Sequence, residues 1–190
     1  NSVARYALDG NLNDKWGTNT GSQSGVSFTS NAIRGQAGGF QSSNNDLIDA
    51  GDFADGLNDY TVSAWINPDS LTGITNIVKK DGGGIRNKRH FSLRIEDSNG
   101  RISVFSRDKD GNSLKTVSDR TVSANNWAFV AGRVKDDTAE VYVNGEQKKS
   151  DSDPSYTRHP ASSEPVQIGG DNVGGFLYYD GSIDDVRIYN

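Results

Sequence analysis

Short runs of alternating apolar and polar residues are the feature that most constrains the fold of this chain. Alternation with a period of two is the pattern of a β-strand with one buried face, and β-branched and aromatic residues fill these runs. No stretch of ten or more residues keeps a convincing helical period, so we predict an all-β protein. The clearest alternating runs are residues 60–66, 91–95, 102–105, 127–131 and 141–143.

Turn signals separate these runs. Asn99-Gly100 and Asn144-Gly145 suit type I′ hairpins, because both positions tolerate positive φ. Asp110-Gly111 and Asp180-Gly181 are similar. We count roughly a dozen strands at the short spacing of sandwiches and barrels. The sequence therefore predicts an antiparallel sandwich of two packed sheets.

The size and composition of the chain limit the classes of function. Its 190 residues suit a single domain spanning residues 1–190, and we expect a module cut from a longer protein. A net charge of −5 argues against nucleic-acid binding, which needs a clustered basic face. No apolar run approaches the roughly 18 residues of a membrane span. The absence of Cys excludes disulfides and thiolate metal sites.

Both ends of the chain carry a short acidic motif, at residues 8–14 and 181–190. In the last strand, alternation counted from Val186 and Ile188 places Asp184 on the inward face. An inward carboxylate is costly unless it is paired or binds a metal. If the two end strands are neighbours, the acidic motifs meet and offer the hard oxygen ligands that Ca²⁺ prefers.

Two long polar segments, residues 81–90 and 150–165, are expected to be surface loops, where binding usually occurs. The first is basic, and Arg and Lys donate hydrogen bonds to carboxylates and sulfates. We therefore predict contact with an anionic ligand there, and the alternative is a solvated loop. The predicted contact residues are Arg86, Lys88, Arg89 and His90.

Aromatic side chains can also bind sugars, by stacking on their C–H faces. Trp65 and Trp127 lie in alternating strands, and we predict that both are in the core. Trp16 lies in a polar stretch, and Tyr178 has a tyrosine neighbour, so that one of that pair must face outward if the segment is a strand. We predict Trp16 and Tyr178 as ligand platforms, with core packing or loop cover as the alternative.

The order of the motifs resembles that of the laminin-G-like, concanavalin A-like lectin/glucanase domains of the jelly-roll type, nearly from end to end. The resemblance implies a jelly-roll sandwich, and Ca²⁺ held between the Asp-Gly-Asn turn and the final strand. It assigns the metal to Asp9, Asn11 and Asp184, with Asp14 or Asn13 joining and carbonyls of residues 35–39 completing the site. Alternatively, Asp9 and Asn11 only form an Asx-turn and Asp184 pairs with an arginine. The matching segments are residues 6–14, 35–40, 60–68, 126–132, 141–145 and 181–190.

Enzymatic chemistry has little support in the sequence. Residues 108–112 look like a calcium loop, but Ser113 and Asp119 occupy the positions where an EF-hand needs Gly and Glu, so we predict a hairpin turn. Hydrolases similar to this family carry a Glu-x-Asp-x-x-Glu strand motif, which none of the four glutamates fits. Neither His90 nor His159 has the context of a catalytic triad.

We therefore expect a non-catalytic, lectin-like module, monomeric and stabilised by Ca²⁺, in a secreted or cell-surface protein. Its ligand would be a polysaccharide or other glycan, and the basic segment favours an anionic one. Two alternatives remain open. The domain is a structural or adhesive protein-interaction unit of a large extracellular protein, or it is a polysaccharide lyase or glycoside hydrolase whose motifs are not recognised.

Overall fold

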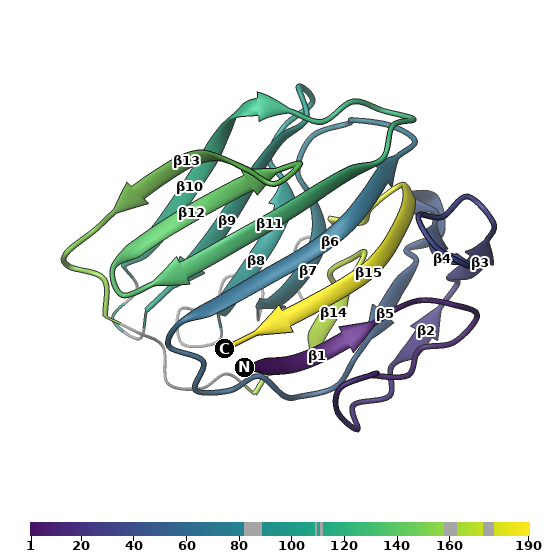
Figure 1. Ribbon diagram of the computed structural model, residues 1–190, viewed down its shortest axis with the longest axis horizontal. Coiled ribbons are helices and arrows are strands. Elements are labelled where there is room, and N and C mark those ends of the chain that lie inside the picture. Colours follow the sequence, from purple (N-terminus) through teal and green to yellow (C-terminus); the bar gives the residue numbers. More distant parts are fainter. Residues whose placement is uncertain (82–88, 109, 111, 158–162, 173–176) are drawn as a thin grey trace.

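The alternating runs form the strands of two packed antiparallel sheets in a computed structural model. The structure describes residues 1–81, 89–108, 110, 112–157, 163–172 and 177–190. One sheet has eight strands and the other has seven (Figure 1). In spatial order the eight-stranded sheet contains β13 (Glu146–Ser152), β12 (Thr138–Val143), β11 (Ala128–Lys135), β6 (Tyr60–Pro68), β15 (Gly181–Tyr189), β4 (Ala37–Phe40) and β3 (Ser27–Thr29), with β1 (Ser2–Tyr6) paired to β15.

The seven-stranded sheet forms the other layer. Its spatial order is β10 (Ser113–Thr121), β9 (Arg101–Arg107), β8 (Arg89–Ile95), β7 (Thr75–Asp81), β14 (Val166–Ile168), β5 (Leu47–Asp49) and β2 (Ser22–Ser24). A 3-10 turn, η1 (Ser42–Asn44), precedes β5. No helix in the described ranges combines the length and apolar character needed to cross a membrane.

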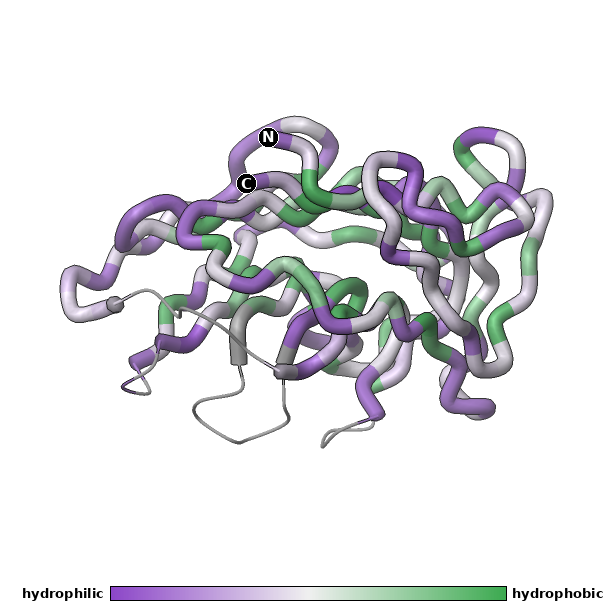
Figure 2. The backbone as a smooth tube through the Cα atoms, turned by 90° about the horizontal axis from the view of Figure 1, so that it is seen from below, coloured by the Kyte–Doolittle hydropathy of each residue, from purple (hydrophilic) through white to green (hydrophobic). Residues whose placement is uncertain are grey.

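The core lies between the two layers, which Figure 2 shows one above the other. In β12, Ala139, Val141 and Val143 are buried, and the residues between them are only partly covered. In β6 the even-numbered residues from Tyr60 to Ile66 face the core. The antiparallel sandwich predicted from the alternation is confirmed.

The turn at Asn144-Gly145 has positive φ at both residues, 53° and 81°, as a type I′ hairpin requires. In the turn at Asn99-Gly100 only Gly100 has a positive φ, of 80°, and Asn99 does not. The type I′ prediction is therefore wrong for the turn between β8 and β9. A longer connection from Ile95 to Arg101 does not impose the tight twist that selects type I′.

A β-bulge in the last strand reverses the predicted orientation of Asp184. Ile183 pairs with Ile66 in the core and Asp184 pairs with Trp65, but the register then shifts before Arg187 pairs with Ser63. The bulge contains Asp185, whose φ is 48°. The inserted residue breaks the alternation of side chains between the two faces of the sheet. Asp184 therefore lies on the outer face, and the prediction that it faces inward is wrong.

The prediction that Trp65 and Trp127 belong to the core is also wrong. Trp65 is an odd-numbered residue of β6, so it lies on the outer face, where its ring centroid is 5.5 Å from that of Phe129. Trp127 precedes β11, is partly exposed, and donates a hydrogen bond from Nε1 to Asn31 Oδ1 at 3.1 Å. Both indoles belong to the outer surface of the eight-stranded sheet.

Candidate functional site

The acidic motifs from the two ends of the chain meet in a pocket of about 250 Å³ on the outer side of the eight-stranded sheet. The ends meet because β1 pairs with β15. Three carboxylates and three guanidinium groups line the pocket, so its charge is mixed. The lining residues are Arg5, Ala7, Asp9, Ile33, Arg34, Asp184, Asp185 and Arg187.

Asp184 and Asp9 are held in this pocket by backbone N–H groups. Asp184 Oδ2 accepts hydrogen bonds from Ile33 N at 2.9 Å and Arg34 N at 3.3 Å. Asp9 Oδ1 accepts one from Gln36 N at 2.9 Å. Burial raises the pKa of Asp184, and the backbone hydrogen bonds offset only part of this effect. Within the described part of the chain, neither carboxylate forms an ion pair.

The neighbouring Asp185 takes the arginines instead. Arg5 Nε lies 2.7 Å from Asp185 Oδ1, and Arg187 donates from Nε to the same oxygen at 3.1 Å. Burial opposes ionisation of Asp185, but these hydrogen bonds outweigh it and lower the pKa. The alternative in which Asp184 pairs with an arginine is thus not seen; the pairing falls one residue later.

Asn11 and Asp14 are engaged in local turns outside the pocket lining. Asn11 Oδ1 accepts from Asn13 N at 3.1 Å, which is an Asx-turn. Asp14 Oδ1 accepts from the backbone N of Arg5 and of Trp16, at 2.9 and 3.0 Å. In the regions that the structure describes, no three acidic or histidine side chains are placed so that together they could hold a metal ion. The structure therefore brings together Asp9 and Asp184 from the predicted metal set.

A second region with functional chemistry is a row of side chains that crosses the whole seven-stranded sheet. Each residue of the row is the cross-strand partner of the next. From Asp49 to Lys115, each residue of the row has a core residue next to it on its own strand. Because neighbours along a strand face opposite sides of the sheet, the row lies on the outer face. We call it the polar row; its members are Ser22, Asp49, Gln167, Lys79, Ser92, Phe105 and Lys115.

The middle of the polar row is buried although its side chains are polar. Lys79 and Gln167 are each 1% exposed. Lys79 forms an ion pair with Asp171, and Gln167 Nε2 donates to Asn172 Oδ1 at 2.6 Å. Gln167 Oε1 has no hydrogen-bond partner among the residues described. Buried polar groups are costly unless they are satisfied, so such a row suggests a function beyond packing.

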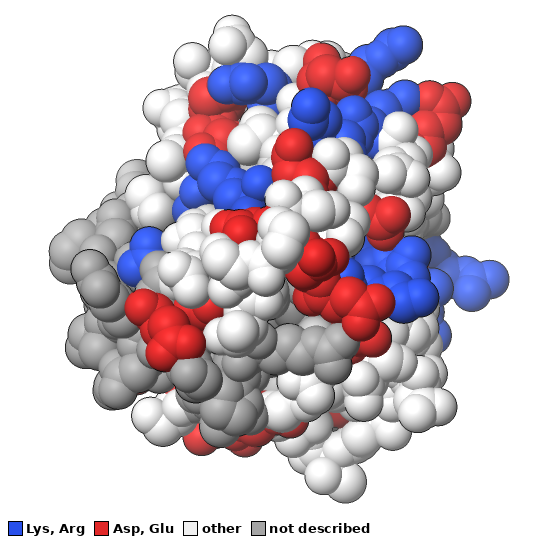
Figure 3. All heavy atoms as spheres, turned by 90° about the vertical axis from the view of Figure 1, so that its left-hand side faces the viewer, with Lys and Arg blue, Asp and Glu red and all other residues white. Residues whose placement is uncertain are grey.

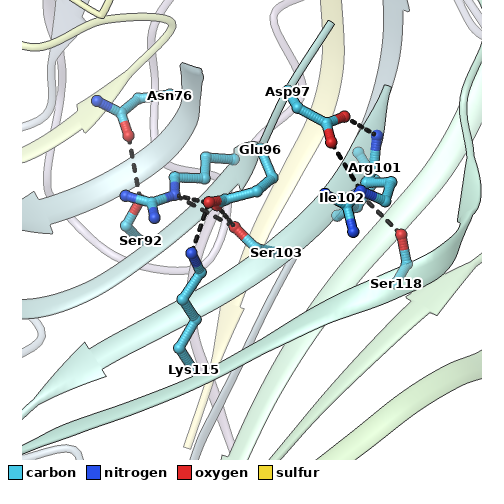
Figure 4. Close-up of polar contacts among 10 residues, drawn as sticks. Asn76, Ser92, Glu96, Asp97, Arg101, Ile102, Ser103, Lys115 and Ser118 are labelled. Atoms are coloured by element: carbon cyan, nitrogen blue, oxygen red, sulfur yellow. Dashed lines mark hydrogen bonds and ion pairs between the residues drawn. The ribbon is translucent and has the colours of Figure 1, made fainter. Parts of the chain in front are cut away.

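At the β10 end of the row, the side chains are charged and linked to one another. Glu96 accepts hydrogen bonds from Lys115 Nζ at 2.5 Å, from Ser103 Oγ at 2.7 Å and from Arg94 Nε at 2.9 Å (Figure 4). Burial opposes the ionised form of Glu96, but the bonds from Lys115 and Ser103 outweigh it and lower its pKa. Glu96 therefore stays an anion and orders the cations around it.

Phe105 provides an aromatic ring at the same end. The guanidinium carbons of Arg94 and Arg107 lie 5.3 and 5.6 Å from the centre of its ring. These distances are within the range of cation–π interactions. Together with Lys115, the two arginines make this end of the row cationic.

The β2 end of the row opens into a pocket of about 290 Å³. Its walls carry hydroxyl, amide and carboxylate groups beside one tyrosine and one leucine. Such a combination of polar and apolar groups is typical of small-molecule sites. The lining residues are Ser22, Gln23, Ser24, Asn45, Leu47, Asp49, Asn172 and Tyr178.

Tyr178 lies in this pocket, but not with a freely exposed ring. Residues 177–180 are not a strand, and Tyr178 and Tyr179 are both buried, at 8% and 0% exposure. The condition under which one of the two would face outward is therefore not met, because alternation applies only within a strand. Burial and the nearby Asp171 raise the pKa of Tyr178. What it presents to a ligand is the part of its surface that lines the pocket.

The other predicted ligand residues lie elsewhere. Trp16 is 38% exposed and packs against Tyr189 with ring centres 5.2 Å apart, on the side of the eight-stranded sheet. Arg86 and Lys88 lie outside the described residues. Arg89 and His90 begin β8, and their side chains are outside the description. Trp16 is therefore on the opposite sheet from the polar row.

Sequence reasoning missed most of the polar row. The signal was present in β8, where Ser92 and Arg94 alternate with Phe91, Leu93 and Ile95, so the polar face of this strand was readable. Its connection to β14 and β5 could not be predicted, because those strands have three residues each.

On the end of the sandwich that Figure 3 shows, basic and acidic side chains are interspersed, which differs from the clustered basic face of nucleic-acid-binding proteins.

Comparison of the sequence with protein families gives one match. The family model described as the concanavalin A-like lectin/glucanases superfamily matches residues 34–190. A search of curated proteins gives no match.

Comparison with solved structures gives neighbours at low sequence identity. Domain 4 of the extracellular arabinanase AbnA from Geobacillus stearothermophilus, solved with arabinotriose, is 19% identical with a TM-score of 0.79, over 100% of this chain and 92% of that one. A CBM40 domain of the Ruminococcus gnavus IT-sialidase, bound to α2,3 sialyllactose, is 19% identical with a TM-score of 0.58, over 70% and 75%. The binding domain of botulinum neurotoxin serotype D is 18% identical with a TM-score of 0.75, and the match covers 99% of this chain and 48% of that one.

Proposed function

Because the chain belongs to the concanavalin A-like lectin/glucanases superfamily, we propose that it is a non-catalytic glycan-binding module. The fold alone does not select this function. Support comes from solved neighbours that contain arabinotriose and sialyllactose, and from the chemistry of the outer face of the seven-stranded sheet.

The observation that carries the proposal is the polar row with its terminal pocket. Sugars present many hydroxyl groups and apolar C–H faces, so their sites combine hydrogen-bonding side chains with aromatic rings. The accessible ends of the row supply hydroxyl, carboxylate and ammonium groups from Ser22, Asp49 and Lys115, with Phe105 at one end and Tyr178 in the pocket at the other. In this proposal a glycan binds at the ends of the row, because Gln167, Lys79 and Ser92 in its middle are only 1–2% exposed.

The cations at the β10 end favour an anionic glycan. Arg94 and Arg107 lie over Phe105, and Arg94 and Lys115 bind Glu96. Arginine binds carboxylates and sulfates through its planar guanidinium. We propose that this end binds the acidic group and that the pocket at the β2 end binds an uncharged unit.

The carboxylates in and beside the row do not resemble a hydrolytic pair. Glycoside hydrolysis uses a general acid whose pKa is raised, whereas the pKa of Glu96 is lowered. Asp171 is committed to Lys79, and Asp49 Oδ1 accepts a hydrogen bond from Gly51 N at 2.8 Å. These commitments support binding without catalysis.

We further propose that Asp9 and Asp184 hold a Ca²⁺ ion in the pocket at the chain ends. Both carboxylates line the pocket, and the raised pKa of Asp184 reflects a buried charge that a cation would stabilise. Ca²⁺ takes about six to eight oxygen ligands, so backbone carbonyls and water would supply the rest. Asn11 and Asp14 would have to give up their present hydrogen bonds to take part. The ion would fix the chain ends and the loop at residues 33–36.

The proposed setting is a monomeric module of a secreted or cell-surface protein. The arabinanase neighbour is described as extracellular, which supports this setting. A glycan-binding module of this kind would tether its parent protein to a polysaccharide, with weak single-site affinity raised by multivalency.

Calorimetric titration with 3′-sialyllactose and with arabinotriose, in the presence of Ca²⁺, tests the proposal. Binding of either probe that weakens about ten-fold or more in Lys115→Ala or Gln23→Ala supports the site at the corresponding end of the row. Arg133→Ala is the matched control, since Arg133 pairs with Glu140 on the opposite sheet. Failure of both probes and of a wider glycan array would favour a structural or protein-interaction domain, and new reducing ends or unsaturated products would favour an enzyme.

A further inference from the structure

The opposite face of the sandwich has a pocket of its own, of about 220 Å³, over β3, β4 and β15. It is separate from the pocket at the chain ends and from the polar row. Its lining is almost entirely uncharged, with a single carboxylate. The lining residues are Ser27, Thr29, Asn31, Gly39, Phe40, Gln41, Asp69, Gly181 and Ser182.

Small side chains form the floor of this pocket. Ser182 pairs with Gly39, and Gly39 pairs with Ser27, so the three residues share the outer face of neighbouring strands. A Cβ atom on Gly39 would lie 2.9 Å from Ser27 Oγ, closer than real Cβ contacts. Glycine at this position therefore keeps the floor open.

A buried amide with an unused acceptor continues the same cross-strand row. Asn67 on β6 pairs with Ser182, and it is only 6% exposed. Its Oδ1 atom has no hydrogen-bond partner in the described part of the protein. Because buried polar atoms are nearly always hydrogen-bonded, this oxygen is an unfilled acceptor next to the lining residue Ser182, although Asn67 itself does not line the pocket.

Two partly exposed indoles lie beside this row. Trp127 donates its Nε1 hydrogen to Asn31, a lining residue of the pocket. Trp65 lies two residues before Asn67 on the same face of β6 and packs against Phe129. Aromatic rings that adjoin amide and hydroxyl groups present both an apolar surface and hydrogen bonds to a ligand.

We propose that this pocket, with Trp127 beside its lining residue Asn31, is a second ligand site that binds one uncharged sugar unit. Its one charged lining residue is Asp69, which accepts hydrogen bonds from hydroxyl groups and repels acidic sugars. The volume is below the roughly 300 Å³ at which sites for larger small molecules begin, so a single terminal unit fits its size. The site extends the proposed function to a second face, but it does not depend on the polar row.

Intrinsic fluorescence separates the two faces, because all three tryptophans lie on the side of the eight-stranded sheet. Trp65 is on β6, Trp127 is hydrogen-bonded to Asn31, and Trp16 packs against Tyr189 of β15. A ligand in the second site would change the indole emission. A ligand confined to the polar row would contact phenylalanine and tyrosine and leave the indoles unchanged.

The test is a fluorescence titration with arabinotriose, cellotriose and mannotriose, with calorimetry on the same samples. The expected result is a saturable change in indole emission with at least one probe. The affinity for that probe should fall ten-fold or more in Asn31→Ala and in Trp127→Phe, and it should be retained in Lys115→Ala. Thermal unfolding of each variant shows that it is folded. Calorimetric binding without a change in indole emission would overturn the second site and leave the proposed function standing. No indole response to any of the three sugars would likewise overturn it, while binding of 3′-sialyllactose alone would still support the polar row.

Discussion

Asp184 and Trp65 lie directly opposite each other on β15 and β6, on the outer face of the eight-stranded sheet. The bulge at Asp185 produces this arrangement by adding one residue to the strand. The carboxylate therefore lines a pocket outside the core, although Asp184 is only 2% exposed. Asp9 reaches the same pocket from the other end of the chain.

This position of Asp184 leads to a prediction for Asp184→Asn. Without Ca²⁺ the variant should be as stable as the wild type or slightly more stable, because a buried charge is removed while an oxygen remains to accept the bonds from Ile33 and Arg34. With Ca²⁺ at 100 times its Kd, the wild type should gain about 2.7 kcal/mol and the variant should gain little. Thermal unfolding with Ca²⁺ and with EDTA measures both effects. An equal Ca²⁺ shift in the two proteins would exclude Asp184 as a ligand.

Titration of the metal-free protein provides a related prediction. The pKa of Asp184 is raised above its ordinary value of 3.8, so the folded state holds this proton more tightly than the unfolded state. Its contribution to stability should therefore fall as the pH rises from below 4 through the raised pKa. The difference between wild type and Asp184→Asn, measured by urea unfolding in EDTA across pH 3 to 6, should show this trend, and an opposite trend would contradict it.

Asp108 should behave in the opposite way. Burial opposes its ionisation, but hydrogen bonds from Thr157 and Asn112 outweigh this effect and lower its pKa to about 2. Its contribution is complete above the ordinary pKa near 4 and is lost as the pH falls through 2. We expect Asp108→Asn to cost about 1–2 kcal/mol at pH 7 and less at pH 2. Asp119→Asn is the control, because Asp119 is exposed on β10; an equal loss at both pH values would contradict the prediction.

Lys80 should be important for stability, since its side chain is fully buried. Its Nζ donates to Asp52 Oδ1 at 2.6 Å and to the carbonyl oxygen of Glu164 at 2.7 Å. We expect Lys80→Met to destabilise the domain by about 1–3 kcal/mol. The loss stays below that of a fully buried pair because Asp52 is half-exposed and can be hydrated. Denaturant unfolding against Lys135→Met, an exposed lysine of β11, measures it, and equal effects would show that the buried contacts contribute nothing.

Salt should distinguish the two ligand classes. If Arg94, Arg107 and Lys115 bind an acidic group, affinity for 3′-sialyllactose should fall several-fold between 0.1 and 1 M NaCl, as the Debye length shrinks from about 10 to about 3 Å. Affinity for arabinotriose should change little over the same range. Titration calorimetry at both salt concentrations measures this difference, and equal salt dependence of the two probes would contradict the assignment of the cationic end.

The sequence predicts the sandwich because alternation in strands such as β6, β8 and β12 reports which residues are buried. The same rule fails at Asp184, since one inserted residue reverses the face and leaves no mark in the pattern. At Trp65 the rule holds, since its neighbours Ala64 and Ile66 face the core, and the error lay in assigning Trp65 to the core because its strand alternates. The alternation rule does not apply to Tyr178, because residues 177–180 are not a strand. The meeting of Asp9 with Asp184 was predictable, because the motifs of the two ends imply that they are neighbours.

The polar row also fixes the distance between its two accessible ends. Backbone hydrogen bonding sets the step between adjacent strands at about 4.8 Å, so Ser22 and Lys115 are separated by six strand steps that no side-chain substitution can change. A glycan that contacts both ends would be selected by how well its length matches this span. Mutations at either end would then alter which substituents are accepted, while the span between the ends stays a property of the sheet.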